Sequence, residues 1–186
     1  MLKYLKPYTE AGLQKIFRNL PRINPNIITI AGLVPPALFF YFMMHGRFGW
    51  AIVFYVGTLF DLIDGAYARA TNQATKFGAV LDASLDRISD ALIISAFGFS
   101  GLVSWWLCIA LLTASMTISY IKARGEAHGA DGKALSIGPI ERSERLAIML
   151  IGLIIFAALS SNELADKLIG LQILHYIFII LLTLSV

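Results

Sequence analysis

The sequence predicts an all-α integral membrane protein, with six transmembrane helices preceded by an N-terminal interfacial amphipathic helix. Of the 186 residues, 58% are hydrophobic and 15% are charged, whereas an ordinary soluble domain carries about 25% charged residues. Six apolar stretches are long enough to cross a bilayer, which takes roughly 20 residues of helix. None of them alternates apolar and polar residues as a strand would. The single cysteine, Cys108, excludes a disulfide framework and a cysteine-built metal centre.

Residues 1–26 are expected to form a juxtamembrane helix that lies in the membrane interface. Leu13, Ile16, Phe17 and Leu20 recur at helical spacing, with polar and basic residues between them. The continuous apolar core of a cleavable signal peptide does not occur in this stretch. A flexible basic tail is the alternative interpretation.

Residues 27–186 are expected to form the six-helix bundle, so that residues 1–186 make a single membrane domain. The fifth apolar run is short, but residues 140–145 can extend it as a helix into the interface. The adjacent Pro35 and Pro36 predict a kink in the first span. The expected spans are Ile27–Met44, Trp50–Ala68, Phe77–Phe99, Val103–Ile121, Leu146–Leu159 and Leu168–Val186.

The basic residues set the expected orientation of these spans. Only Arg47 and Lys167 fall on one side of the membrane, and Arg87 lies within the third span. The positive-inside rule then makes the opposite side cytoplasmic, with both termini on it, in a multi-pass protein of the cell membrane. The residues on the cytoplasmic side are Lys3, Lys6, Lys15, Arg18, Arg22, Arg69, Lys76, Lys122, Arg124, Lys133, Arg142 and Arg145.

Aspartates gather where the second and third spans meet the cytoplasmic side. Asp61 and Asp64 are three residues apart, and Asp82 and Asp86 are four apart, so each pair shares a helix face. Asp90 follows within the third span. The short connection predicts that the two spans are antiparallel neighbours, which would bring four carboxylates together.

Clustered carboxylates favour hard divalent cations such as magnesium, calcium or manganese, and two bridged metals are suited to phosphate chemistry. His45, His128 and His175 lie away from the aspartates, which argues against zinc. A set of structural salt bridges, a proton path or a cation transporter would also place carboxylates in a membrane. All four carboxylates, however, lie toward one face of the membrane, whereas a transporter site is expected near the midplane.

Small residues separate the two aspartate pairs. Gly65, Ala68 and Gly78 allow a ligand to approach the backbone closely. Arg69 ends the second span, where its fork of donors can contact a phosphate.

The stretch from Asp61 to Asp86 resembles the signature of the CDP-alcohol phosphotransferases. That signature reads D-x-x-D-G-x-x-A-R, eight residues, then G-x-x-x-D-x-x-x-D, and every fixed position is matched here. The resemblance implies an enzyme that displaces CMP from a CDP-activated lipid with the hydroxyl of a second alcohol. It also implies a homodimer and assigns no nucleic-acid partner.

The resemblance assigns the signature residues to two divalent metals and to the CDP group. Asp86 would also be the general base that accepts the proton of the attacking hydroxyl. The implied metals are two Mg²⁺ ions per active site, with Mn²⁺ as the alternative. The implied metal ligands are Asp61, Asp64, Asp82 and Asp86, and the implied CDP-site residues are Asp61, Asp64, Gly65, Ala68, Arg69, Gly78 and Asp82.

Four cations flank the fourth and fifth spans: Lys122, Arg124, Arg142 and Arg145. From spacing alone they either bind the phosphate of the acceptor or follow the positive-inside rule and contact anionic lipids. The surrounding stretches resemble the inositol-phosphate branch of the family, which implies that they bind the phosphate of myo-inositol 1-phosphate. The lipid substrate would be CDP-diacylglycerol or CDP-archaeol, and glycerol 3-phosphate is the alternative acceptor.

Overall fold

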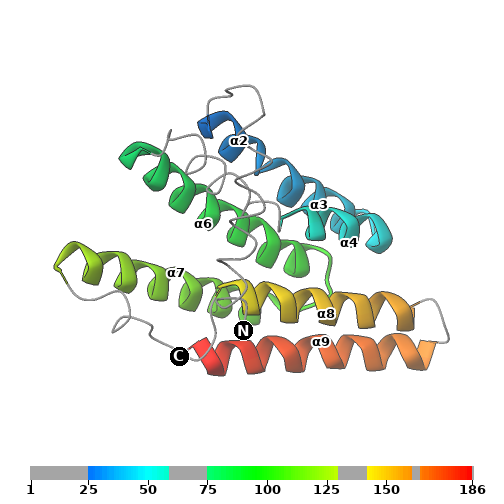
Figure 1. Cartoon of the computed structure of the whole chain (residues 1–186). Coiled ribbons are helices and arrows are strands. Elements are labelled where there is room, and N and C mark those ends of the chain that lie inside the picture. The colour runs from blue at the N-terminus through cyan, green and yellow to red at the C-terminus, as the bar shows by residue number, and fades with distance from the viewer. Residues whose placement is uncertain (1–24, 59–74, 130–141, 161–163, 186) are drawn as a thin grey trace, which may run out of the picture.

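The computed structural model of the chain describes residues 25–58, 75–129, 142–160 and 164–185. The regular elements in these ranges are all helices, which confirms the predicted class. Residues 1–24, where the interfacial helix is expected, lie outside the described residues. The helices are α2 (Pro25–Ala31), α3 (Val34–Met44), α4 (Phe48–Gly57), α6 (Lys76–Phe99), α7 (Trp105–Ala127), α8 (Arg142–Ser160) and α9 (Leu164–Ser185) (Figure 1).

Length and apolarity identify a multi-pass membrane protein. Among the described residues, four helical segments are long and apolar enough to cross a membrane: Asn26–Met44, Trp105–Ala127, Arg142–Ser160 and Ala165–Ser185. The apolar α4 has 10 described residues, and α6 has 24 residues but includes several charged side chains. The total of six spans therefore stays a prediction.

The first span is broken, as its two prolines predict. A turn at Gly32 and Leu33 separates α2 from α3, and Leu33 N–H donates to the Ile30 carbonyl at 3.1 Å in a tighter i→i−3 bond. Pro35 and Pro36 have no N–H to donate to the preceding turn. The regular helical bonding is therefore interrupted just before them.

The described helices α3, α4, α8, α9, α7 and α6 pack in a closed ring, in which each contacts the next and α6 returns to α3. Fully buried aromatic side chains from five of them fill the interior: Phe39, Tyr55, Phe97, Phe156 and Phe178. The ring centroids of Phe97 and Phe178 are 5.1 Å apart. The ring of helices thus encloses an apolar core, while its outer surface carries many exposed apolar side chains, as a lipid-facing surface requires.

In the described part of the second span, α4 and α6 are not main neighbours, and the expected side-by-side packing of the second and third spans stays a prediction for residues 59–68, which lie outside the described residues. The helices that α4 contacts most are α3 and α8, whereas α6 packs against α2, α3 and α7. Phe39 of α3 lies between them, with its ring centroid 5.0 Å from that of Tyr55 and 6.0 Å from that of Phe97. The first span therefore inserts between the two helices that the short connection suggested would be neighbours.

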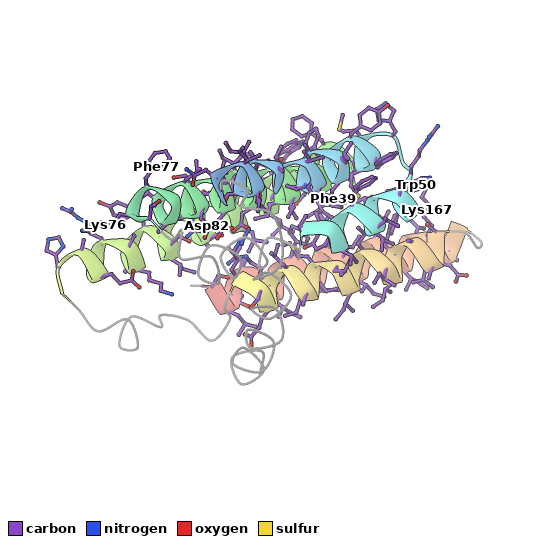
Figure 2. The ribbon with its side chains drawn as sticks, turned by 45° about the horizontal axis from the view of Figure 1, so that its top comes forward. Phe39, Trp50, Lys76, Phe77, Asp82 and Lys167 are labelled. Carbon is purple, nitrogen blue, oxygen red and sulfur yellow. The ribbon has the colours of Figure 1, made fainter. Side chains whose placement is uncertain are left out.

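The two ends of the bundle carry different residues. Lys76, Phe77 and Asp82 lie toward one end, whereas Trp50 and Lys167 lie toward the other (Figure 2). This arrangement separates the charged N-terminal half of α6 from the end that carries Lys167.

Candidate active site

Three aspartates follow one another along a single face of α6. Thr75 caps this helix, because its hydroxyl accepts a hydrogen bond of 2.9 Å from the Gly78 N–H. Asp82, Asp86 and Asp90 then recur every four residues, which places them one turn apart on one face. The Asp86 side chain is 22% exposed and that of Asp90 is 1% exposed. The acidic face therefore runs from the accessible start of the helix into the bundle.

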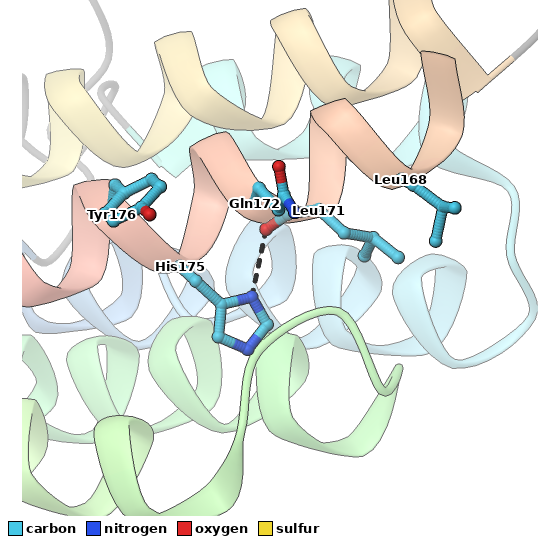
Figure 3. Close-up of a pocket in the computed structure, with 5 residues that line it drawn as sticks. All are labelled: Leu168, Leu171, Gln172, His175 and Tyr176. Carbon is cyan, nitrogen blue, oxygen red and sulfur yellow. Dashed lines mark hydrogen bonds between the residues drawn. The ribbon is translucent and has the colours of Figure 1, made fainter. Parts of the chain in front are cut away.

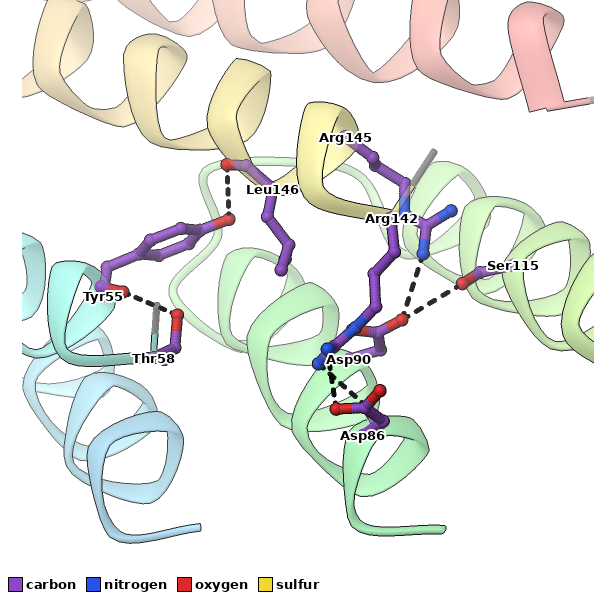
Figure 4. Close-up of polar contacts among 8 residues, drawn as sticks. All are labelled: Tyr55, Thr58, Asp86, Asp90, Ser115, Arg142, Arg145 and Leu146. Carbon is purple, nitrogen blue, oxygen red and sulfur yellow. Dashed lines mark hydrogen bonds and ion pairs between the residues drawn. The ribbon is translucent and has the colours of Figure 1, made fainter. Parts of the chain in front are cut away.

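The first turn of α8 supplies a cation that joins two of these acids. Arg142 donates from Nη1 to Asp86 Oδ1 at 2.6 Å and from Nε to Asp90 Oδ1 at 2.8 Å (Figure 4). A longer contact of 3.4 Å runs from its Nη2 to the backbone carbonyl of Asp86. The Arg142 side chain is 28% exposed. One guanidinium thus spans two carboxylates and stays partly accessible.

Asp90 of α6 is linked by side-chain hydrogen bonds to both α7 and α8. Its Oδ2 accepts hydrogen bonds from Arg145 Nη2 at 3.0 Å and from Ser115 Oγ at 3.4 Å. Arg145 is buried, with 5% of its side chain exposed. Since Arg142 contacts the other oxygen, both carboxylate oxygens have partners, as a buried charge requires.

Tyr55 of α4 is hydrogen-bonded to the backbone near the start of α8. Its hydroxyl donates to the Leu146 carbonyl at 2.9 Å, and both residues are buried. At the end of α4, the Thr58 hydroxyl donates to the Tyr55 carbonyl at 2.6 Å. The α8 turn that carries Arg142 and Arg145 is therefore fixed to α4 as well as to α6.

Gly78, a predicted CDP-site residue, lies where the starts of α2 and α6 approach. A Cβ atom at this position would be 3.1 Å from Thr75 Oγ1 and 3.3 Å from Asn26 Oδ1, closer than most real Cβ contacts. The missing side chain therefore allows the helix cap and Asn26 to come together beside the acidic face.

Five of the predicted site residues lie outside the described residues: Asp61, Asp64, Gly65, Ala68 and Arg69. The other two predicted metal ligands, Asp82 and Asp86, share one face of α6. In the part of the chain that the structure describes, no three His, Cys, Asp or Glu side chains form a group that could hold a metal ion. The convergence of four carboxylates accordingly stays a prediction.

The donor chemistry of the described residues fits a hard divalent cation. Asp82 and Asp86 offer carboxylate oxygens, the ligands that magnesium and manganese prefer. The ring Nδ1 atoms of His45, His128 and His175 each lie within 2.9 Å of the carbonyl four residues earlier in their own helices. Each of the three imidazoles therefore has a backbone contact within its own segment.

The four predicted acceptor cations separate into two kinds. Arg142 and Arg145 lie against the acidic face of α6, whereas Lys122 and Arg124 are exposed near the end of α7. Lys122 and Arg124 are about 10 and 13 Å farther along α7 than Ser115, at 1.5 Å per residue. The structure thus joins Arg142 to the predicted base Asp86 and Arg145 to Asp90, and it places Lys122 and Arg124 farther out.

A surface hollow elsewhere takes no part in this network. It is formed by α9 and has an apolar lining, with His175 at one edge (Figure 3). His175 Nδ1 lies 2.9 Å from the Leu171 carbonyl, and its Nε2 accepts a 3.3 Å hydrogen bond from Ser104 N–H. One neutral tautomer satisfies both contacts, so His175 acts as a packing contact between α9 and the 100–104 turn. The lining residues are Leu168, Leu171, Gln172, His175 and Tyr176.

Sequence reasoning assigned no role to Asp90, Ser115 or Tyr55. Asp90 carried a signal, because it continues the spacing of Asp82 and Asp86 and is a charge within a span. Ser115 and Tyr55 carried none, since each acts through a partner that is distant in sequence.

The model of the CDP-alcohol phosphatidyltransferase family matches residues 22–185 of the chain. Among curated proteins, the archaetidylinositol phosphate synthase of Pyrococcus horikoshii is 37% identical over 154 residues, which cover 81% of each chain. Family and relative agree with the resemblance found in the signature residues.

Two crystal structures of the Mycobacterium tuberculosis phosphatidylinositol phosphate synthase resemble this chain. The structure with CDP-DAG bound has a TM-score of 0.71 and 32% identity, over 92% of this chain and 89% of the other. The complex with manganese and citrate has a TM-score of 0.67 and 30% identity, over 94% of this chain and 84% of the other. Each of the two comparisons thus covers more than nine tenths of this chain.

Proposed function

The chain belongs to the CDP-alcohol phosphatidyltransferase family. From this membership we propose that it transfers the phosphatidyl or archaetidyl group of a CDP-lipid to myo-inositol 1-phosphate, with release of CMP. Because this family consists of enzymes, we reject the alternative interpretation of the chain as a cation transporter. The acceptor is supported by the two relatives, one an archaetidylinositol and the other a phosphatidylinositol phosphate synthase. Because they differ in lipid, both CDP-diacylglycerol and CDP-archaeol are candidate donors.

In the proposed reaction, the acceptor hydroxyl oxygen attacks the phosphorus that carries the lipid. A new phosphodiester bond forms, the bond to the CMP oxygen breaks, and Asp86 accepts the hydroxyl proton. A carboxylate can act as this base when the hydroxyl lies within hydrogen-bond reach. The position of Asp86, between the accessible and buried parts of α6, is compatible with such access.

The observation that carries the proposal is the contact between Arg142 and Asp86 at 2.6 Å. A guanidinium binds phosphate through parallel hydrogen bonds. An acceptor phosphate held by the accessible Arg142 would therefore place a hydroxyl of the same molecule beside the proposed base. We propose that the four cations together form the site that binds the phosphate of the acceptor. The exposed Lys122 and Arg124 would contact it as it enters the site, and the buried Arg145 lies deepest in the site.

The metal and CDP sites are proposed from the signature. Two Mg²⁺ ions, or Mn²⁺ in their place, would neutralise the diphosphate and stabilise the leaving CMP when bound. The manganese complex of the M. tuberculosis enzyme supports a divalent cation. The proposed ligands are Asp61, Asp64, Asp82 and Asp86, and the proposed CDP-contacting residues are Asp61, Asp64, Gly65, Ala68, Arg69, Gly78 and Asp82.

The proposed setting is a single-domain homodimer in the cell membrane. The basic residues near the active-site end favour a cytoplasmic location for that end and for both termini. This location would give the site access to a water-soluble phosphorylated acceptor.

A CMP-release assay in detergent with magnesium tests the proposal. Each CDP-lipid is offered with inositol 1-phosphate, glycerol 3-phosphate, serine or free inositol, and Asp86→Asn serves as the inactive control. Release only with inositol 1-phosphate supports the proposed acceptor. Release only with glycerol 3-phosphate would retain the chemistry and overturn the acceptor, and release with free inositol would overturn the role of Arg142.

A further inference from the structure

Asp90 is a buried carboxylate that the proposed reaction does not use. It lies one turn beyond Asp86 on α6, and 1% of its side chain is exposed. An isolated charge in such a place is costly, and in a membrane span a charge is a functional hypothesis by default. The contacts of Asp90 indicate what it does.

Two arginines of α8 meet at this one carboxylate. Asp90 Oδ1 accepts from Arg142 Nε at 2.8 Å, and Oδ2 accepts from Arg145 Nη2 at 3.0 Å. Ser115 Oγ contacts the same Oδ2 at 3.4 Å. Asp90 is therefore bonded to side chains of both α7 and α8, and each of its two carboxylate oxygens contacts a different arginine.

Fold stability alone does not explain the ion pairs of Asp90. Arg145 Nε is buried and has no hydrogen-bond partner among the described residues. A buried ion pair is weak evidence for net stability, and in some proteins such pairs specify geometry instead. Here the ion pairs of Asp90 specify the orientation of the Arg142 guanidinium.

Asp90 fixes the Arg142 guanidinium at one edge. With Nε held by Asp90, the guanidinium plane points Nη1 at Asp86 Oδ1, 2.6 Å away. A long arginine side chain otherwise loses much rotamer freedom when it binds a ligand. A guanidinium held in advance binds a phosphate at a lower entropic cost.

We propose that Asp90, supported by Arg145, is a positioning residue that holds Arg142 ready for the acceptor phosphate and in register with Asp86. This inference rests on the proposed function in one respect, that the acceptor carries a phosphate. It assigns Arg145 a supporting role behind Asp90 and leaves the direct phosphate contact to Arg142, the more exposed of the two.

Steady-state kinetics of Asp90→Asn test the inference, with the acceptor and the CDP-lipid varied in turn. Loss of a charge-assisted bond is expected to raise the KM for the phosphorylated acceptor about tenfold or more. The KM for the CDP-lipid is expected to stay within about twofold, since the hydrogen bonds of Asp90 among the described residues are with Arg142, Arg145 and Ser115. Equal changes in both KM values, or in neither, would overturn the inference.

Two further variants keep the test decisive. Asp90→Asn leaves Arg145 as an uncompensated buried charge, so the double variant Asp90→Asn/Arg145→Gln is expected to recover the folded yield while the acceptor KM stays high. If the double variant restores the acceptor KM to that of the wild type, the role of Asp90 is only structural and the inference fails. Tyr55→Phe is the matched control, because it weakens the attachment of the same α8 turn without a change of charge. Its acceptor KM is expected to stay unchanged.

The wild-type enzyme separates this inference from the proposed function. If glycerol 3-phosphate proves to be the acceptor, the proposed function fails, but the KM comparison still tests Asp90 with that substrate. If only an unphosphorylated alcohol is used, both proposals fail. If inositol 1-phosphate is used and Asp90→Asn leaves its KM unchanged, only the positioning role is overturned.

Discussion

Arg142 Nη1 lies 2.6 Å from Asp86 Oδ1, an ion pair that joins the first turn of α8 to α6 across 56 positions of sequence. The pair brings the proposed phosphate-binding cation to the proposed general base. In the proposed function, the pair would hold the phosphate of one acceptor molecule beside the base that accepts its hydroxyl proton.

Asp86→Asn is expected to lower kcat by at least about 100-fold, because the amide cannot accept the hydroxyl proton. Rates of CMP release at saturating substrates measure the effect. Asp166→Asn, in the first turn of α9, is the matched control and should keep the wild-type rate. A kcat for Asp86→Asn within about tenfold of the wild type would exclude Asp86 as the base.

The sequence predicted which segments are helical better than it predicted the residues at which the helices end. Hydropathy ends the fourth span at Ile121, yet α7 continues to Ala127. Lys122, Arg124 and Glu126 belong to residue types that favour helix, so the helix extends beyond the apolar segment. Apolar length predicts where the membrane ends, whereas backbone bonding decides where the helix ends.

The candidate site was predicted in part. Spacing alone placed Asp82 and Asp86 on one helix face, because the α-helical repeat fixes that relation. The pairing of Arg142 with Asp86 and Asp90 depends on how the bundle places the start of α8 opposite α6, which no local pattern encodes. The insertion of Phe39 between α4 and α6 was missed for the same reason.

Tyr55→Phe is expected to destabilise the fold by about 1 kcal/mol, the net value of a typical hydrogen bond. The variant leaves the buried Leu146 carbonyl without the donor at 2.9 Å. Thermal unfolding in detergent measures the loss, and Tyr41→Phe, at an exposed position, is the matched control. An unchanged unfolding midpoint for Tyr55→Phe would show that the bond does not hold α8.

Gly152→Ala is expected to destabilise the packing of α8 on α9 by about 1–3 kcal/mol, the usual cost of overpacking. The added Cβ would lie 2.7 Å from Ile177 Cδ1 and 3.3 Å from Leu174 Cδ2. Thermal unfolding again provides the measurement. Gly49→Ala, where a Cβ meets nothing within 4 Å, should cause no loss.

Shortening the side chain that obstructs the new Cβ checks the cause. Ile177→Val removes the Cδ1 atom, so the double variant Gly152→Ala/Ile177→Val should be more stable than Gly152→Ala alone. If the second substitution gives no recovery, the close contact with Ile177 is not the source of the loss.

Removal of divalent cations is expected to abolish CMP release, and magnesium or manganese should restore it. Binding to the folded protein should also raise the unfolding midpoint as the cation concentration rises. Asp82→Asn should reduce this shift, whereas Asp166→Asn should preserve it. Full activity in the presence of excess chelator would contradict a metal-dependent site.

The KM for inositol 1-phosphate in Arg142→Lys tests whether the Arg142 guanidinium binds the acceptor phosphate. Lysine keeps the charge but loses the planar fork that contacts both carboxylates and a phosphate. We expect the acceptor KM to rise about tenfold or more while the CDP-lipid KM stays within about twofold. Arg47→Lys, exposed and remote from the carboxylates, should change neither value. An unchanged acceptor KM in Arg142→Lys, or an equal rise in both KM values, would show that Arg142 does not bind the acceptor phosphate.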